Sequence, residues 1–125
     1  MTDSIKQYIK EIKSYNVDDA SEHTYRPHLQ TLINAIQFPK ENITPIHEGK
    51  DKTVEIEGTP DFFIYKDYTT LFKSLVGFIE CKKITRNLDD VIESEQIKRY
   101  SKTTENIIIT NYREFILLQK GKIKA

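Results

Sequence analysis

Apolar residues recur with helical spacing in the first third of the chain. Residues 3–15 carry apolar side chains at i, i+3, i+4 and i+7, namely Ile5, Tyr8, Ile9 and Ile12, and this is the period of an amphipathic helix. A second apolar stripe runs over residues 25–36. Ser21 is suited to cap the start of that helix, and Pro39 marks its end. The pattern therefore predicts two consecutive helices.

Beyond Pro39 the period shortens to that of β-strands. Runs of β-branched and aromatic residues, bounded by turn residues, are typical of strands. We predict strands at residues 43–47, 61–65, 75–82, 106–110 and 114–119, with a shorter piece at 54–56. Residues 88–102 return to helical spacing and predict a third helix. The order ααβββαββ predicts an α/β domain with a mixed central β-sheet flanked by helices.

The composition is that of a globular chain, and it argues against disordered, membrane-spanning and secreted proteins. A length of 125 residues is typical of one domain spanning residues 1–125, and 38% hydrophobic with 30% charged residues excludes a disordered chain. No apolar run approaches the roughly 20 residues of a membrane helix, and residues 1–13 lack the apolar core of a secretory signal. Cys81 is the only cysteine, so it cannot form an internal disulfide. We expect a cytoplasmic domain that contacts no membrane.

The charge balance limits how the chain could bind nucleic acid. The 19 basic and 19 acidic residues give a formal net charge of zero, whereas a strongly basic surface is typical of a domain that binds nucleic acid unaided. If DNA is the substrate, the basic residues must cluster locally, or another domain must supply most of the phosphate contacts.

Three residues at two neighbouring strand ends carry the chemistry. Side chains alternate between the two faces of a strand, so Glu80 and Lys82 share a face with Phe78, while Ile79 and Cys81 share the other. Asp61 begins the preceding predicted strand. If the two strands pair antiparallel, Asp61 approaches Glu80 closely enough to share one cation.

Such a set is suited to phosphodiester hydrolysis. Mg²⁺ prefers one or two carboxylates and retained waters, and it generates a nucleophile from a bound water. A lysine beside the attack position can orient or deprotonate that water. The sequence therefore predicts a metal-dependent phosphodiesterase site.

The same residues resemble a known family. Residues 58–61 (Gly-Thr-Pro-Asp), eighteen further residues and then residues 80–82 (Glu-Cys-Lys) are similar to the PD-(D/E)XK motif of restriction-endonuclease-like nucleases. Gln96 and Tyr100 match the Gln-x-x-x-Tyr element of nuclease domains in Type I and Type ISP restriction–modification enzymes. Residues 22–29 resemble the first-helix segment of those domains, and residues 106–115 resemble their strand-turn-strand. The resemblance covers residues 20–121.

This resemblance implies a restriction-endonuclease-like fold and a role for each matched residue. Asp61 and Glu80 would bind Mg²⁺, for which Mn²⁺ would substitute, with the Cys81 carbonyl as a third ligand. Lys82 would be the catalytic lysine, which Gln96 and Tyr100 would brace unless they contact the DNA backbone. Glu22 would be an auxiliary acid. The phosphate contacts would come from nearby basic residues: Lys83, Arg86, Lys98 and Arg99.

The resemblance also implies partners. Such domains are cleavage modules of larger enzymes that carry a methyltransferase and often a helicase, in the same chain or as subunits. This chain would then be an excised domain, a truncated product or a stand-alone relative. The oligomeric state stays open, although cutting both strands of a duplex generally requires two such sites, which a dimer could supply.

Two alternatives stay open. The same fold could serve as a non-catalytic module that binds nucleic acid or protein, and the substrate could be RNA or a branched junction. The histidines and Cys81 lack the spacing of a zinc site, and no glycine-rich phosphate loop is present. The recognition sequence is not encoded in any of these patterns.

Overall fold

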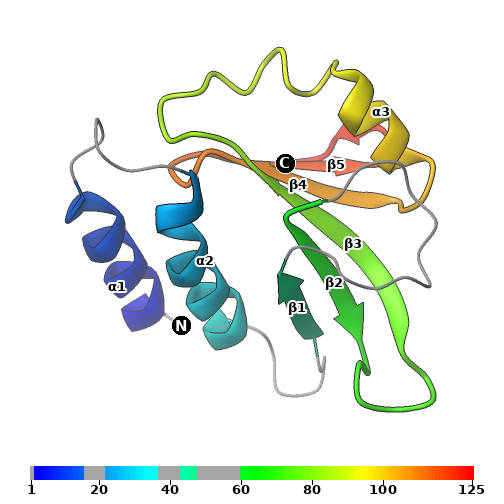
Figure 1. Ribbon diagram of the computed structural model, residues 1–125, viewed down its shortest axis with the longest axis horizontal. Helices are drawn as coiled ribbons and strands as arrows, with labels where there is room; N and C mark the ends of the chain where they lie inside the picture. The colour runs from blue at the N-terminus through cyan, green and yellow to red at the C-terminus, as the bar shows by residue number, and fades with distance from the viewer. Residues whose placement is uncertain (1, 16–21, 37–42, 48–59) are drawn as a thin grey trace.

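The computed structural model describes residues 2–15, 22–36, 43–47 and 60–125. Helices α1 (Thr2–Lys13) and α2 (Glu22–Ile36) come first (Figure 1). Among the described residues, strands follow them, and a short helix lies between the third and the fourth strand. Those elements are β1 (Ile43–His47), β2 (Phe62–Lys66), β3 (Ser74–Cys81), α3 (Glu95–Ser101), β4 (Asn106–Thr110), β5 (Phe115–Gln119) and β6 (Lys122–Ile123). The predicted α/β class with a mixed sheet is confirmed. The predicted piece at residues 54–56 and the predicted cap Ser21 lie outside the described residues, as do residues 58–59 of the Gly-Thr-Pro-Asp motif.

The six strands found in the described residues form one sheet in chain order, β1-β2-β3-β4-β5-β6. Every neighbouring pair is antiparallel except β3 with β4, which is parallel. A parallel pair needs a long crossover, and the segment that contains α3 supplies it (Figure 1). Gly77 permits the close approach of the two parallel strands, because a Cβ there would lie 2.5 Å from the carbonyl oxygen of Asn106.

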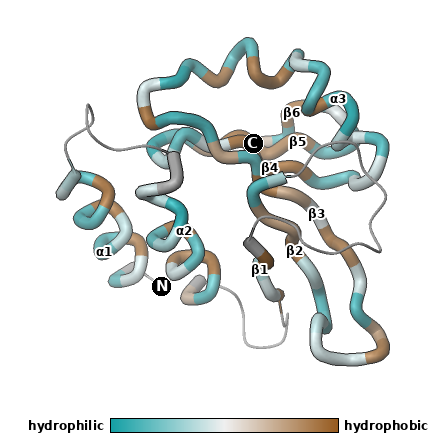
Figure 2. The backbone as a smooth tube through the Cα atoms, viewed as in Figure 1, coloured by the Kyte–Doolittle hydropathy of each residue, from teal (hydrophilic) through white to brown (hydrophobic). Residues whose placement is uncertain are grey.

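Helices cover both faces of this sheet. On one face, α1 and α2 pack on alternate strand residues, among them Phe62, Ile79 and Cys81. On the other face, α3 and the segment before it pack on Phe63 and Phe78. Figure 2 shows apolar positions concentrated along β3, β4 and β5. The buried residues of β3 and β4 follow one another along the strand, as expected for parallel strands with both faces covered. The predicted division between Phe78 on one face and Ile79 with Cys81 on the other is therefore confirmed.

Only half of the predicted apolar stripe of α1 is buried. Tyr8 and Ile12 lie in the core, whereas Ile5 and Ile9 are 42% and 46% exposed. The Tyr8 hydroxyl donates a hydrogen bond of 2.8 Å to the carbonyl oxygen of Tyr112 and so fixes the helix to the turn between β4 and β5. Within the described residues, none of the helices has the length and apolar content needed to cross a membrane.

The third predicted helix is shorter than its apolar spacing indicated. Residues 88–94 form turns, and α3 begins only at Glu95. Ser94 caps it, because its hydroxyl accepts a hydrogen bond from the Ile97 amide. Upstream, the Asn87 side chain accepts a bond from the Asp89 amide. These side-chain bonds to the backbone compete with a helix over residues 87–94.

Strand β6 lies beyond the last strand predicted from the sequence, at residues 114–119. Lys120 and Gly121 both have positive φ, 52° and 79°. Two such central residues form the tight turn that suits a β-hairpin, and Lys122 then pairs with Gln119.

Candidate active site

Asp61 and Glu80 meet at one end of the β2–β3 pair. The two strands are antiparallel, with Phe62 opposite Ile79, so one residue further along Asp61 faces Glu80. Both acids are buried, with 7% and 4% of their surface exposed. The predicted antiparallel pairing is thus correct. A pair of ionised carboxylates at this depth requires nearby positive charge or hydrogen-bond donors.

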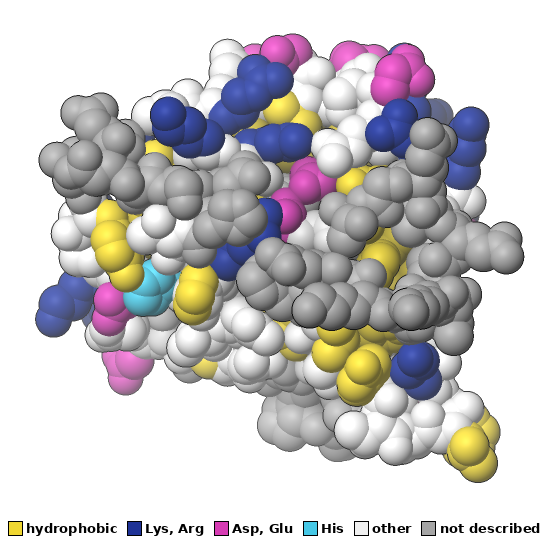
Figure 3. All heavy atoms as spheres, in the orientation of Figure 1, with side chains coloured by type: hydrophobic (Ala, Val, Ile, Leu, Met, Phe, Trp, Pro, Cys, Tyr) yellow, Lys and Arg dark blue, Asp and Glu magenta, His cyan; other side chains and the backbone are white. Residues whose placement is uncertain are grey.

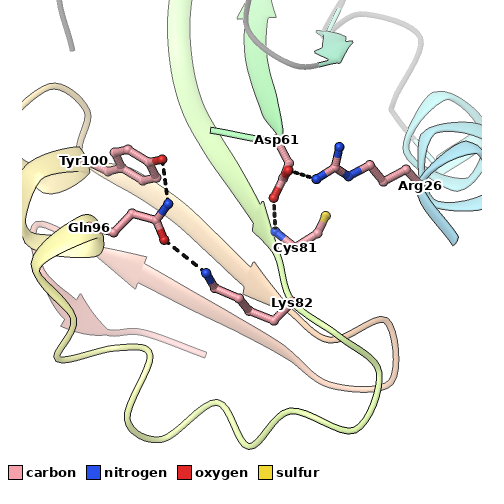
Figure 4. Close-up of polar contacts among 6 residues, drawn as sticks. All are labelled: Arg26, Asp61, Cys81, Lys82, Gln96 and Tyr100. Carbon is pink, nitrogen blue, oxygen red and sulfur yellow. Dashed lines mark hydrogen bonds and ion pairs between the residues drawn. The ribbon is translucent and has the colours of Figure 1, made fainter. Parts of the chain in front are cut away.

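Donors from two other parts of the chain bind Asp61 (Figure 4). The Cys81 amide donates a 2.7 Å hydrogen bond to Asp61 Oδ2. The Arg26 guanidinium, which comes from α2, forms an ion pair and hydrogen bond with Asp61 Oδ1. Arg26 is itself only 4% exposed. Each oxygen of Asp61 therefore has a protein donor, and the carboxylate is held in one orientation.

Lys82 is held from the other side, by α3. Its Nζ donates a 3.1 Å hydrogen bond to Gln96 Oε1, and Gln96 Nε2 donates one of 3.1 Å to the Tyr100 hydroxyl. Figure 4 shows the three side chains in a row from the end of β3 to α3. Gln96 and Tyr100 lie four residues apart and hence on one side of the helix. The structure therefore brings together the lysine and the two residues expected to brace it.

Tyr100 connects this row with the acids. Burial raises the pKa of its hydroxyl above the usual value, and the negative charge of Glu80 raises it further, with a hydrogen bond between Tyr100 and Glu80 acting in the same direction. Tyr100 is fully buried, and its hydroxyl stays protonated at neutral pH. It is therefore a hydrogen-bond donor to Glu80 and an acceptor from Gln96.

Cys81 lies between Glu80 and Lys82 in the sequence, and it is buried. Only 1% of it is exposed, and burial raises the pKa of its thiol to about 12. At neutral pH the thiol is protonated, so it is a poor nucleophile. Cys81 and Ile79 lie in the same core cluster, as their shared strand face predicts. The backbone amide of Cys81 was not predicted to bind Asp61.

The acids suit a divalent cation of the hard type. Among the described residues, no group of three or more His, Cys, Asp or Glu side chains could hold a metal, so within this part of the chain the acidic ligands of a site here would be Asp61 and Glu80. Two carboxylates with water completing the coordination are what Mg²⁺ takes. The buried Arg26 guanidinium on Asp61 shows that a positive charge is accommodated at this position. The residues present therefore fit Mg²⁺.

The remaining predicted site residues are less closely assembled. Lys83, Arg86 and Lys98 are exposed and Arg99 is half-buried. Arg86 forms an ion pair of 3.0 Å with Asp90, and Lys98 lies 4.0 Å from Glu95. Glu22 is the first residue of α2, but its side chain lies outside the described residues, as does that of His23. On the face seen in Figure 3, acidic side chains lie at the centre with Lys and Arg side chains on either side of them.

Arg26 is the residue of this site that sequence reasoning missed. Its position 35 residues before Asp61 gave no local reason to join the two. The one available indication was that residues 22–29 belong to the family resemblance, in which a Tyr-Arg pair follows an acid.

Comparison with known proteins places the fold. No family model matches the chain, and no curated protein matches it. Several solved chains do match, among them one from the cryo-EM structure of a DrdV–DNA complex, with a TM-score of 0.77. The match covers 100% of this chain and 85% of that chain, at 21% sequence identity. At this identity the likeness shows a shared fold, and it fits the restriction-endonuclease-like fold implied by the sequence.

Proposed function

We propose that this chain is a Mg²⁺-dependent endonuclease domain that hydrolyses DNA phosphodiester bonds as the cleavage module of a restriction system. The observation that carries the proposal is the meeting of two buried acids, Asp61 and Glu80, with Lys82 directly after the end of β3, the strand that carries Glu80. The likeness in fold to a chain from a DNA complex supports DNA as the substrate, together with the resemblance in sequence to restriction nucleases.

Asp61 and Glu80 would hold the cation, with the Cys81 carbonyl as a further ligand. When bound, Mg²⁺ would neutralise charge on the phosphate and lower the pKa of a coordinated water. The protein's part is to fix both carboxylates in position. The Cys81 amide does this for Asp61 through a 2.7 Å bond, and the register of β2 with β3 sets the position of Glu80.

Lys82 would orient the attacking water or a phosphate oxygen. An ammonium group has three N–H donors, and Gln96 accepts from one of them. Because Gln96 Nε2 donates to Tyr100, its oxygen is the end that faces Lys82. The row Tyr100–Gln96–Lys82 therefore holds the ammonium in place before substrate arrives, which lowers the cost of ordering it during the reaction.

The basic residues Lys83, Arg86, Lys98 and Arg99 would contact phosphates. Their number is small and the net charge of the chain is zero, so their contribution to DNA affinity is modest and falls with salt. We propose that attached methyltransferase or helicase domains, or a second copy of the chain, supply the rest of the DNA contacts.

Plasmid nicking tests the proposal. Wild-type protein should nick supercoiled DNA with Mg²⁺ or Mn²⁺ and not with EDTA. Asp61→Asn and Lys82→Met should each lower the rate by about 100-fold or more, while Lys102→Met, an exposed lysine at the end of α3, should not. Circular dichroism verifies that each variant is folded. Equal cleavage by wild type and both site variants would contradict the assignment.

One observation favours a second candidate. The Arg26 guanidinium already neutralises Asp61, as it would in a non-catalytic DNA-binding domain of the same fold. Isothermal titration with Mn²⁺ separates the two. A nuclease should bind the cation and lose it in Glu80→Gln, whereas a binding module should bind none in any variant.

A further inference from the structure

Arg26 contacts Asp61 from α2, which covers the face of the sheet opposite to α3. It belongs to α2, whose neighbouring residues Tyr25 and Leu29 pack on the face opposite to α3. Its guanidinium nevertheless contacts Asp61 Oδ1, and the two side chains are 5% and 10% exposed. An arginine is charged at every pH at which the protein is folded, so this is a permanent positive charge beside a proposed metal ligand.

A divalent cation at Asp61 would meet this charge at close range. Two positive charges a few ångströms apart repel each other, and the repulsion is larger in a buried site than in water. The carboxylate also offers limited room. Oδ2 accepts a 2.7 Å hydrogen bond from the Cys81 amide. A cation would therefore compete with the Arg26 guanidinium for Oδ1.

Displacing Arg26 need not disturb the acid. The Cys81 amide would keep Asp61 in its orientation, since that bond uses the other oxygen and the backbone of β3. The arginine side chain is long and joined to a helix, so it can move without a change in the sheet. The acid thus has one donor from the backbone of β3 and one from a side chain of α2.

We propose that Arg26 is a built-in competitor of the metal, filling the cation position on Asp61 and setting the affinity of the site for divalent ions. The proposal rests on the proposed function, because it concerns the same two acids. It assigns Arg26 as a positioning residue that holds Asp61 in the metal-free protein and leaves Oδ1 when a cation enters.

Metal affinity, measured without DNA and without turnover, tests this directly. Mn²⁺ binding is followed by the loss of the electron paramagnetic resonance signal of the free ion, in wild type, Arg26→Gln and Arg26→Lys. Arg26→Gln removes the charge and should bind Mn²⁺ about tenfold more tightly or better. Arg26→Lys keeps the charge and should remain close to wild type. Lys10→Gln removes an exposed charge on α1 and controls for the change in net charge.

The site is identified by a double variant and by stability. Arg26→Gln combined with Asp61→Asn should lose the gain in affinity. The Tm of Arg26→Gln should be lower than that of wild type without metal, and Mn²⁺ should raise it more than it raises wild type. If Arg26→Gln is unfolded without metal, recovery of its circular dichroism on addition of Mn²⁺ supports the proposal, and failure to recover overturns it.

The remaining outcomes distinguish failure of the competitor role of Arg26 from failure of the metal site itself. Equal or weaker Mn²⁺ binding by Arg26→Gln, with wild-type binding that Glu80→Gln abolishes, overturns the competitor role and leaves the metal site in place. No Mn²⁺ binding in wild type or in Arg26→Gln overturns both. In wild type, ¹⁵N resonances of the Arg26 guanidinium should shift on addition of Mg²⁺, and should not shift in Asp61→Asn.

Discussion

The site has two halves that the fold supports in different ways. The acidic half consists of Arg26, Asp61 and Cys81, and it is enclosed between α2 and the ends of β2 and β3. The lysine half consists of Lys82, Gln96 and Tyr100, and its row of hydrogen bonds is partly open to solvent. Charges that are enclosed must be neutralised for the chain to fold, whereas a partly solvated lysine contributes little to stability. We therefore expect the stability of the fold to depend on the acidic half, and the positioning of the Lys82 ammonium to depend on the lysine half.

The largest effect should follow from breaking the buried ion pair. Asp61→Ala leaves the Arg26 guanidinium buried without its carboxylate, and removing one member of such a pair costs about 3–5 kcal/mol. Urea unfolding followed by circular dichroism measures the loss. Replacing both partners, as in Arg26→Met with Asp61→Leu, should recover much of it, because no charge is then left buried. A loss below about 1 kcal/mol in Asp61→Ala would place the pair in solvent.

An intermediate effect should appear at high pH, on the face covered by α1 and α2. Burial raises the pKa of the Cys81 thiol from its ordinary value of 9.0 to about 12. The unfolded chain releases this proton near pH 9, and the folded chain keeps it. The stabilising contribution is therefore complete below pH 9 and declines as pH rises toward 12, by about 1 kcal/mol between pH 9 and pH 10.

Denaturation midpoints from pH 7 to 11 measure this decline. Cys81→Ala should move its onset to about pH 10, where the tyrosines begin to titrate in the unfolded chain. Burial raises the pKa of Tyr8, Tyr100 and Tyr112 in the folded protein as well, so they act in the same direction at higher pH. An unchanged onset in Cys81→Ala would contradict the assignment to the thiol.

The smallest effect on stability should come from the lysine half. Gln96→Ala removes two part-buried hydrogen bonds and should cost about 1 kcal/mol of unfolding free energy. Its effect on nicking should be larger, roughly tenfold or more in rate, because Lys82 is then no longer held. Tyr100→Phe, which is one bond further from the lysine, should lower the rate less. Lys102→Ala is the matched control on α3, and a fall in stability that fully accounts for the lost rate would contradict a positioning role.

Much of the fold followed from local patterns. The spacing of apolar residues predicted both N-terminal helices and the strands at residues 43–47 and 106–110 with their observed bounds. Alternation predicted which side of β3 each residue faces, because that depends only on the pleat of one strand. The third helix was overextended and β6 was missed, since side-chain bonds at Asn87 and Ser94 and the positive φ of Lys120 override apolar spacing there.

The sequence by itself determined the acids and lysine of the candidate site. Asp61, Glu80 and Lys82 lie on neighbouring strand segments, so a period of two and an antiparallel pairing suffice to bring them together. Gln96 and Tyr100 were found through a motif, and their contact with Lys82 needed the crossover that returns α3 to the end of β3.

Only the tertiary structure decided what holds Asp61. The Arg26 guanidinium is brought to it by the packing of α2 on the sheet, and the Cys81 amide by the register of two strands. Neither partner has a spacing or composition that marks it, because contacts between distant segments depend on the path of the whole chain and not on local period. The charge beside the acids, on which metal affinity depends, is therefore a property of the fold.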